Sequence, residues 1–369
     1  MRAVGIILAG GNNSRMKELS RKRAVGAMPI AGSYRAIDFA LSNMANSHIQ
    51  KVAILTQYNA RSLNEHLSSS KWWDFGRKQG GLYVFTPTIT AENSNWYRGT
   101  ADALYQNLHF LKRSHEPYVV LASGDGIYKL DYNKILEYHI QKRADITVVC
   151  KEMPEGEDLS RFGQVKADDD GRIRGYEEKP MIETSRNVSC GIYVIRRRLL
   201  IELIERAAEE DRYDLVKDIL IRYKDIKRIY AYQLETYWNN ISSVEAYYRT
   251  NMDFLNKDVR KILTQEPFIA SKPSDDPPAK YNPTAEVTNT LVGTGSIIDG
   301  NVKNSVLFRK VFVGEGATVE NSVIMKSSYI GKGCVIKNAI IDKEVVISDN
   351  KEVIGTEEEP IVIGKGQVI

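Results

Sequence analysis

Residues 292–295 read Val-Gly-Thr-Gly, and the same aliphatic-Gly-x-Gly unit returns at 313–316, 330–333 and 363–366. The first two spacings, 21 and 17 residues, bracket the roughly 18 residues of a three-sided coil made from three hexapeptides. Between these units, aliphatic residues recur at about six-residue steps: Val302, Val306, Val319, Val323, Val335 and Ile341. One inward aliphatic residue per hexapeptide is typical of a parallel β-helix. We therefore expect a left-handed β-helix over residues 286–369.

A glycine-rich antiparallel sheet is the alternative for this region, but hairpins would not repeat the same phase four times. Hexapeptide β-helices also occur in acyltransferases, which usually use a histidine as general base. All five histidines precede the repeats: His48, His66, His109, His115 and His139. An acyltransferase is therefore disfavoured, and we expect the coil to serve oligomerisation and effector binding.

The N-terminal part has a different sequence pattern, in which short aliphatic runs alternate with amphipathic helical segments. The runs are Val4–Ala9, Lys51–Thr56, Tyr118–Ser123, Asp145–Cys150 and Gly191–Ile195. Continuous aliphatic runs of this length indicate strands buried on both faces of a mostly parallel sheet with crossover helices. We expect a Rossmann-like α/β domain over residues 1–256. A proline-rich stretch then predicts a linker over residues 257–285.

Composition and charge set limits on function and location. Net charge is +4, with 51 basic and 47 acidic residues, which argues against a dedicated nucleic-acid binder. The three cysteines form no paired motif, so we expect them to be small buried side chains in a reducing compartment. No signal peptide and no run of about 20 apolar residues is present, so we expect no membrane association and a cytoplasmic protein.

A glycine-rich turn follows the first predicted strand, at Leu8-Ala9-Gly10-Gly11-Asn12-Asn13-Ser14-Arg15-Met16. Glycines after a buried strand allow backbone amides to approach a ligand, and the following helix start favours phosphate. The turn does not fit the Gly-x-Gly-x-x-Gly pattern, so a nicotinamide dehydrogenase is disfavoured.

From this turn onward the chain resembles the bacterial glucose-1-phosphate adenylyltransferase (ADP-glucose pyrophosphorylase) family. The resemblance covers essentially the whole chain, including the repeats. Its motifs are Tyr34-Arg35-Ala36-Ile37-Asp38-Phe39-Ala40-Leu41-Ser42-Asn43, Leu55-Thr56-Gln57-Tyr58, Asn95-Trp96-Tyr97-Arg98-Gly99-Thr100-Ala101-Asp102-Ala103, Ser123-Gly124-Asp125-Gly126-Ile127-Tyr128-Lys129, Tyr176-Glu177-Glu178-Lys179-Pro180 and Tyr237-Trp238.

The resemblance implies a reaction in which ATP and glucose 1-phosphate give ADP-glucose and diphosphate, a step of glycogen synthesis. The sugar phosphate supplies the attacking oxygen, so catalysis rests on positioning, charge neutralisation and Mg²⁺. It further implies catalytic roles for Arg15, Asp125 and Lys179, with Asp125 as a magnesium ligand. The implied nucleotide-binding residues are Leu8, Ala9, Gly10, Gly11, Gln57, Gly99 and Thr100. The implied glucose 1-phosphate residues are Tyr97, Gly163, Glu178, Lys179, Ser189 and Trp238, and Lys22 is a candidate effector residue.

The chain departs from the family pattern at charged positions. Active members carry Arg-Gly where this chain has Asn12-Asn13, Lys-Pro where it has Val25-Gly26, and histidine at Gly126. They carry a second metal-binding aspartate where this chain has Asn240, and a neutral amide is a weaker magnesium ligand. Such losses should lower turnover by orders of magnitude.

These departures resemble the second, regulatory subunit type of the family. We therefore expect a subunit with weak catalysis that modulates a catalytic homologue in a hetero-oligomer, most simply a tetramer. Its expected ligands are ATP or ADP-glucose, glucose 1-phosphate and a sugar-phosphate or nucleotide effector. The alternatives are a slow but self-sufficient adenylyltransferase and a non-catalytic sugar-phosphate-binding scaffold.

Overall fold

The structure is a computed structural model that describes residues 2–11, 14–76, 80–88 and 96–369. The chain forms two compact units. The first unit comprises Met1–Gly11, Ala40–Ala60 and Leu67–Trp238, and the second comprises Asn12–Phe39, Arg61–His66 and Asn239–Ile369. Each unit thus collects segments that are distant in sequence. No helix in the described residues is long and apolar enough to cross a membrane.

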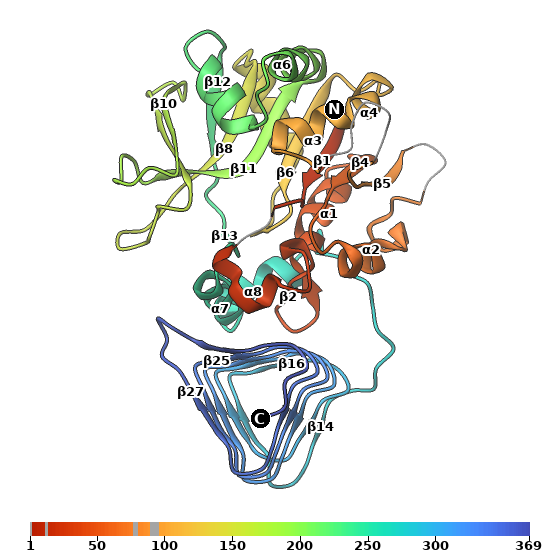
Figure 1. Ribbon diagram of the computed structural model, residues 1–369, viewed down its shortest axis with the longest axis vertical. Helices are drawn as coiled ribbons and strands as arrows, with labels where there is room; N and C mark the ends of the chain where they lie inside the picture. The colour runs from red at the N-terminus through yellow and green to blue at the C-terminus, as the bar shows by residue number, and fades with distance from the viewer. Residues whose placement is uncertain (1, 12–13, 77–79, 89–95) are drawn as a thin grey trace. The chain divides into compact units, whose positions relative to one another are not determined.

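The first unit is built on a nine-stranded sheet. Its parallel part follows the order β6-β1-β4-β5, and β8 and β12 form a further parallel pair. These strands are β1 (Ala3–Leu8), β4 (Lys51–Leu55), β5 (Gly81–Phe85), β6 (Tyr118–Ser123), β8 (Ile146–Glu152) and β12 (Ile229–Gln233). Strands β1, β4, β6 and β8 overlap predicted aliphatic runs, whereas β5 and β12 do not. The expected Rossmann-like parallel arrangement is confirmed (Figure 1).

One long strand joins the two parallel parts of this sheet in the opposite direction. Strand β11 (Asn187–Arg196) is antiparallel to β6, β8 and β9. Strands β9 (Gly163–Ala167) and β10 (Ile173–Glu178) form an antiparallel pair beside it. The aliphatic run at 191–195 predicted the strand but not its direction, because strand direction is set by connections and not by composition.

Amphipathic helices pack on the sheet of the first unit. In α6 (Arg197–Glu209) the buried residues are Leu200, Leu203, Ile204 and Ala207, which form one helical face. The other helical segments of this unit are α1 (Ala36–Asn46), α3 (Thr100–Gln106), α4 (Leu108–Lys112), α5 (Tyr132–Gln141), and the short helices η3 (Ser70–Trp73) and η4 (Val216–Ile221). Cys150 and Cys190 are buried here, as predicted, and Cys334 is buried in the second unit.

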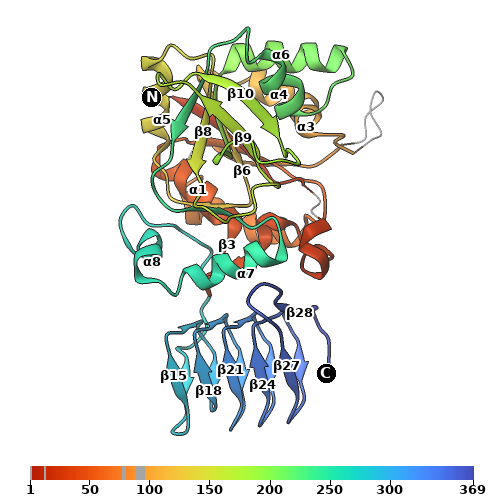
Figure 2. The same cartoon turned by 90° about the vertical axis from the view of Figure 1, so that its left-hand side faces the viewer.

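The second unit contains a β-helix of three parallel five-stranded sheets, which confirms the predicted fold class (Figures 1 and 2). Its sides are the sheets β14-β17-β20-β23-β26, β15-β18-β21-β24-β27 and β16-β19-β22-β25-β28. Equivalent residues in successive coils pair directly, such as Val302 with Val319 and Leu307 with Ile324. Inward aliphatic residues from all three sides form one continuous core, as expected for a left-handed hexapeptide coil.

The strands of the β-helix are two or three residues long. They are β14 (Lys280–Tyr281), β15 (Glu286–Thr288), β16 (Leu291–Val292), β17 (Ile297–Ile298), β18 (Asn301–Lys303), β19 (Val306–Leu307), β20 (Phe312–Val313), β21 (Thr318–Glu320), β22 (Val323–Ile324), β23 (Tyr329–Ile330), β24 (Val335–Lys337), β25 (Ala339–Ile341), β26 (Val346–Ile347), β27 (Glu352–Ile354) and β28 (Ile361–Ile363).

Segments from the first third of the chain pack on the β-helix within the second unit. The Arg23 guanidinium lies 2.5 Å from the Asp342 carboxylate, and both side chains are almost fully buried. On α7 (Val244–Asp253), the Tyr248 hydroxyl donates to the carbonyl of Asn321 at 2.5 Å. These bonds join the N-terminal segment and α7 to the coils.

The remaining elements of the second unit are short. They are η1 (Ser14–Ser20), η2 (Val25–Ala27), β2 (Pro29–Ile30), β3 (Tyr34–Arg35), α2 (Arg61–Leu67) and α8 (Lys257–Thr264). Helix α8 and strand β14 fall inside the predicted linker, residues 257–285. The division of the chain at residues 256 and 286 stays a prediction.

Candidate active site

The glycine turn at the end of β1 is held from both sides by backbone bonds. The carbonyl of Leu8 accepts from the amide of Gly124 at 2.9 Å, and the amide of Ala9 donates to the carbonyl of Leu55 at 2.8 Å. A side chain on Gly11 would meet no atom of the described residues within 4 Å. The backbone therefore reaches open space at the carboxyl edge of the sheet, where open α/β sheets bind their ligands.

Gln57, predicted to line the adenosine pocket, packs beside Gly10 and is held by backbone groups. Its side-chain carbonyl accepts from the amide of Tyr97 at 3.0 Å, and its amide nitrogen donates to the carbonyl of Tyr97 at 3.3 Å. A Cβ on Gly10 would lie 3.5 Å from the Gln57 side chain. The Tyr97 hydroxyl in turn accepts from Asn107 at 2.9 Å. Gln57 therefore fixes the backbone at Tyr97.

Gly99 and Thr100 are both packed against the segment 213–215. A Cβ on Gly99 would lie 2.3 Å from the Tyr213 carbonyl oxygen, so this position requires glycine for close approach. The Thr100 hydroxyl accepts from the amide of Leu215 at 2.9 Å. These contacts give both residues a structural role. Their contact with a nucleotide stays a prediction.

Asp125 follows β6 and lies close to the end of β1, whose Leu8 pairs with Ser123. The Ser123 hydroxyl donates to the Asp125 carboxylate. Among the described residues, no three His, Cys, Asp or Glu side chains gather in one place. Mg²⁺ is usually bound through one or two carboxylates together with substrate phosphates. Asp125 fits that arrangement as a single carboxylate, and a bound Mg²⁺ would neutralise phosphate charge there.

Strand β10 ends at Glu178, whose carboxylate forms an ion pair with the ammonium of the next residue, Lys179, at 3.3 Å. Burial raises the pKa of the Glu178 carboxyl, and the charge of Lys179 opposes that rise. Lys179 has a left-handed φ of 51° before Pro180, a conformation that costs free energy for a residue with a side chain. Its amide donates to the carbonyl of Phe162 at 3.2 Å, which holds this backbone in place.

Gly163, Ser189 and Trp238 belong to the strands around this ion pair, whereas the contacts of Tyr97 are with Gln57 and Asn107. Gly163 is paired with Glu178 across β9 and β10. The Ser189 hydroxyl lies 3.4 Å from that of Tyr193. The Trp238 ring packs on Phe162, with 5.4 Å between ring centroids. We call the following residues the sugar-site cluster: Gly163, Tyr176, Glu178, Lys179, Ser189 and Trp238.

The remaining predicted residues lie outside this unit or outside the described chain. Arg15 is an exposed residue of η1, and Asn240 ends β13 (Trp238–Asn240); both belong to the second unit. Their predicted roles beside Asp125 stay predictions. Asn12 and Asn13 lie outside the described residues.

Comparison with known proteins identifies the family. The nucleotidyl transferase model matches residues 4–257, and the GlmU-like C-terminal hexapeptide model matches residues 277–360. A glucose-1-phosphate adenylyltransferase of Bacillus thuringiensis (strain Al Hakam) is 40% identical over 322 residues, covering 86% of this chain and 85% of the relative. Enzymes of that name from Clostridium novyi (strain NT) and Clostridium botulinum (strain Alaska E43 / Type E3) are 38% and 40% identical over 320 residues, covering 86% of this chain and 84% and 83% of the relatives. The chain belongs to the glucose-1-phosphate adenylyltransferase family.

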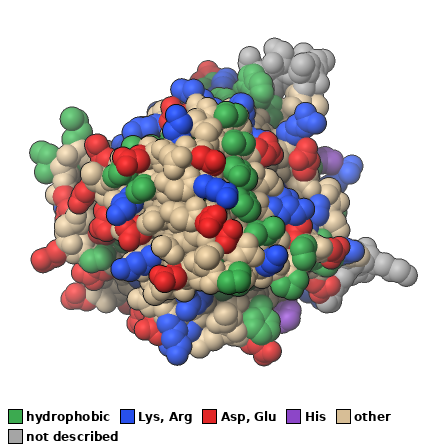
Figure 3. Space-filling view, turned by 90° about the horizontal axis from the view of Figure 1, so that it is seen from below, with side chains coloured by type: hydrophobic (Ala, Val, Ile, Leu, Met, Phe, Trp, Pro, Cys, Tyr) green, Lys and Arg blue, Asp and Glu red, His purple; other side chains and the backbone are tan. Residues whose placement is uncertain are grey.

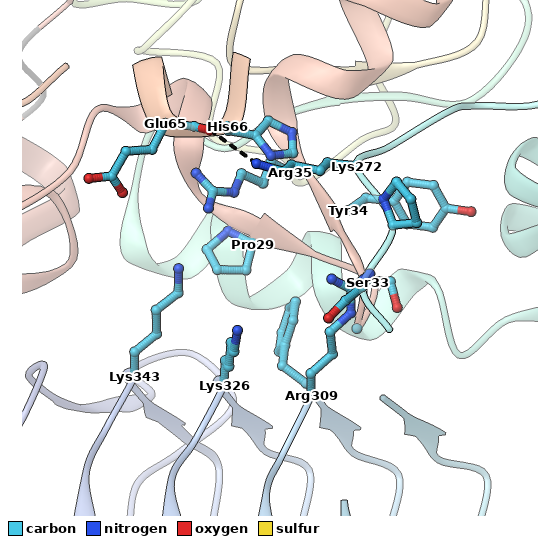
Figure 4. Close-up of a pocket in the computed structure, with 14 residues that line it drawn as sticks. Pro29, Ser33, Tyr34, Arg35, Glu65, His66, Lys272, Arg309, Lys326 and Lys343 are labelled. Atoms are coloured by element: carbon cyan, nitrogen blue, oxygen red, sulfur yellow. Dashed lines mark hydrogen bonds between the residues drawn. The ribbon is translucent and has the colours of Figure 1, made fainter. Parts of the chain in front are cut away.

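This adenylyltransferase family member also carries a cavity of about 310 Å³ within its second unit (Figure 4). We call it the basic pocket, because five cationic side chains line it: Arg35, Lys272, Arg309, Lys326 and Lys343. Glu65 is the carboxylate side chain in its lining, and Lys272 donates to the Glu65 carbonyl at 3.4 Å. So large an excess of cations in one concave site favours a polyanionic ligand.

Three of these cations repeat at the same place in successive coils of the β-helix. Arg309, Lys326 and Lys343 are 17 residues apart and follow β19, β22 and β25 by two positions. Burial and the neighbouring Arg23 and Arg35 lower the pKa of Lys343 to about 7. Lys343 is therefore only partly protonated at neutral pH, which lowers the positive charge of the pocket when no anion is bound.

The repeat in the sequence contained the signal for this pocket, since a 17-residue period of basic residues is visible beside the period of glycines. Only Lys22 was predicted as an effector residue, and it is not among the residues that line the basic pocket. Its role stays a prediction.

Proposed function

We propose that this chain is a regulatory subunit of glucose-1-phosphate adenylyltransferase, with weakened catalysis, that modulates a catalytic homologue. The enzyme would convert ATP and glucose 1-phosphate to ADP-glucose and diphosphate in glycogen synthesis. The observation that carries the proposal is the contrast between a complete sugar-site cluster and the neutral residues Val25 and Asn240 at charged positions of the family.

Val25 and Gly126 support the weakened catalysis. Val25 is only 8% exposed, so the position is packed for an apolar side chain. A Cβ on Gly126 would lie 3.0 Å from the ring of Tyr128. Tyr128 is fully buried, and its hydroxyl is 2.6 Å from that of Tyr132. Neither family side chain, lysine or histidine, fits these positions without movement of the core.

The basic pocket supports the regulatory part of the proposal. Its cations would bind the phosphate groups of a sugar-phosphate or nucleotide effector through charge-assisted hydrogen bonds. Such an effector contacts both the coils, through Arg309 and Lys326, and the N-terminal segment, through Arg35. A ligand that binds one arrangement of these segments better than another shifts the equilibrium toward it.

An exposed apolar ladder on the β-helix supports assembly. The outward residues of one side, β17, β20, β23 and β26, are Ile297, Phe312, Tyr329 and Val346. The rings of Phe312 and Tyr329 stack at 4.8 Å, and Tyr329 remains 42% exposed. Figure 3 shows hydrophobic side chains gathered in a file among mixed charges on the underside of the molecule. We propose that the catalytic homologue, as partner in a hetero-tetramer, covers this ladder.

A slow, self-sufficient adenylyltransferase is the second candidate function. Asp125 with its bonded Ser123 and the Glu178–Lys179 pair favour it, because these groups could still position a metal ion and a sugar phosphate. The decisive difference between the two candidates is whether activity comes from this chain or from its partner.

The test is an assay of diphosphate release by this chain alone, by a catalytic homologue alone, and by the co-purified mixture. Alone, this chain should turn over at least a hundredfold below the typical enzyme value of about 10 s⁻¹. In the mixture it should change the response of the homologue to sugar-phosphate effectors. A mixture in which the homologue has lost its metal-binding aspartate should be inactive.

A matched control uses the double variant Arg309→Ala, Lys326→Ala, which should assemble normally but lose the effector response. Turnover by this chain alone within tenfold of about 10 s⁻¹ would contradict the regulatory role and favour the second candidate.

A further inference from the structure

Tyr176 carries a buried hydroxyl group that lacks a bonding partner in the sugar-site cluster. Its side chain is 4% exposed. Among the described residues, no group makes a hydrogen bond of good geometry with this hydroxyl. The hydroxyls of Ser189 and Tyr193 lie near enough to influence the pKa of Tyr176, which burial raises. Their bond is however with each other, at 3.4 Å.

The Tyr176 hydroxyl and the Glu178 carboxylate face a common point. Both residues lie on the same side of β10, because they are two positions apart in a strand. Gly163 is opposite Glu178 on β9. A Cβ on Gly163 would lie 2.8 Å from Glu178 Oε2 and 2.9 Å from the Tyr176 hydroxyl oxygen. The glycine therefore leaves room for a donor and an acceptor to converge.

An unpaired buried hydroxyl carries the desolvation penalty of the group without a compensating bond, and native proteins rarely retain one without a reason. The indole nitrogen of Trp238, which a Cβ on Gly126 would approach to 3.6 Å, also has no partner among the described residues. An orphan hydroxyl beside a carboxylate matches a ligand that carries several hydroxyl groups. A hexose ring has this chemistry, and Lys179 stands beside it for a phosphate.

We propose that Tyr176 is a further specificity-determining residue, whose hydroxyl donates to a ring hydroxyl of a hexose 1-phosphate while Glu178 accepts from a neighbouring one. This inference rests on the proposed function, because it assumes that the sugar-site cluster binds glucose 1-phosphate. A site built to bond a hydroxyl group discriminates strongly against analogues that lack it, because its own polar groups are then left unpaired.

The experiment is calorimetric titration of the full chain with glucose 1-phosphate and with its monodeoxy analogues. Tyr176→Phe should weaken binding of glucose 1-phosphate about two- to twelvefold, the range of one hydrogen bond. One deoxy analogue should bind the parent chain with the same loss. For that analogue alone, Tyr176→Phe should cause no further loss, as expected when the two changes remove the same bond.

The matched control is Tyr193→Phe, which removes a hydroxyl that already has a partner and should change affinity for all analogues alike. Thermal unfolding separates a binding role from a structural one: Tyr176→Phe should unfold at the same or a higher temperature, because an unpaired polar group is lost. Unchanged binding of glucose 1-phosphate by Tyr176→Phe, or a lowered unfolding temperature, would overturn the inference. Absence of binding to the parent chain would overturn it too, whereas the regulatory proposal fails only in the mixing assay.

Discussion

The two proposed anion sites, the sugar-site cluster and the basic pocket, are built in opposite ways. The cluster takes its residues from 163–238, within the first unit, and includes the buried Ser189 and the half-buried Glu178. The basic pocket draws on segments that range from Pro29 to Lys343 and relies on long cationic side chains. The first therefore depends on one stretch of chain, and the second on both ends of it. Damage to the β-helix should reach the basic pocket and spare the cluster.

The largest expected effect follows from the buried ion pair of Arg23 and Asp342. Asp342→Ala leaves the guanidinium of Arg23 buried without its carboxylate, and removal of one partner of such a pair costs about 3–5 kcal/mol. The free energy of unfolding should fall by that amount in urea titrations. Sulfate binding at the basic pocket should be lost, while affinity for glucose 1-phosphate at the cluster should change less than twofold.

The matched control is Glu315→Ala, which breaks the exposed pair with Lys332 and should cost less than about 1 kcal/mol. Asp342→Asn keeps the shape of the side chain and serves if Asp342→Ala does not fold. Equal losses at both anion sites would show that the two sites are not independent.

The next effect concerns acid stability of the first unit. His139 is 1% exposed, and its Nδ1 lies 2.8 Å from the Thr147 hydroxyl oxygen. Burial lowers the pKa of His139 from 6.5 to about 4. The native state therefore keeps this ring neutral. Its contribution to the free energy of unfolding is complete above pH 6.5 and is lost as pH falls from 6.5 to 4. The loss should reach about 3 kcal/mol.

His139→Gln should flatten this pH dependence in urea unfolding between pH 7 and pH 4, because the amide does not titrate but can still bond Thr147. His109→Gln, an exposed position in the same unit, is the control and should leave the profile unchanged. A profile that keeps its slope in His139→Gln would contradict the assignment.

The smallest effect should appear in the pH dependence of the basic pocket. The pKa of Lys343 is lowered to about 7, so the protonated form predominates below pH 7 and the charge is lost as pH rises. Sulfate keeps its charge over this range, and its affinity should fall about fivefold between pH 6 and pH 8, which corresponds to roughly 1 kcal/mol. Lys343→Arg should remove the dependence, because arginine stays protonated. Glucose 1-phosphate gains negative charge over this range because the second pKa of a phosphate monoester is about 6, so its binding to the cluster should not fall.

The sequence predicted those parts of the fold that depend on local periodicity. The glycine units placed the β-helix, and the aliphatic runs placed β1, β4, β6 and β8. The composition could not show that residues 12–39 would join the coils in one unit, because the bond from Arg23 to Asp342 spans 319 positions. The direction of β11 could not be predicted either, since the aliphatic run around Val194 suits a parallel or an antiparallel strand.

In the candidate site, too, the sequence predicted some features and could not predict others. The motif residues Glu178, Lys179, Ser189 and Gly163 are brought together by three adjacent strands, β9, β10 and β11. Gln57 was predicted as a ligand contact, yet its amide is bonded to the backbone of Tyr97, a pairing that no sequence pattern indicates. Tyr176 could not be singled out, because only the folded structure shows that its hydroxyl lies close to Gly163 and has no partner among the described residues.

The buried pair of Arg23 and Asp342 also sets an order for biosynthesis. A ribosome adds about 5–20 residues per second, so the carboxylate is synthesised roughly 16–64 s after the guanidinium it neutralises. During that interval Arg23 has to remain in water, and the second unit cannot close. The strands of the first unit are all complete by Gln233, so this unit can fold while the coils are still being made. A chain released before Asp342 would carry a finished sheet in its first unit and a second unit in which Arg23 cannot be buried with its carboxylate.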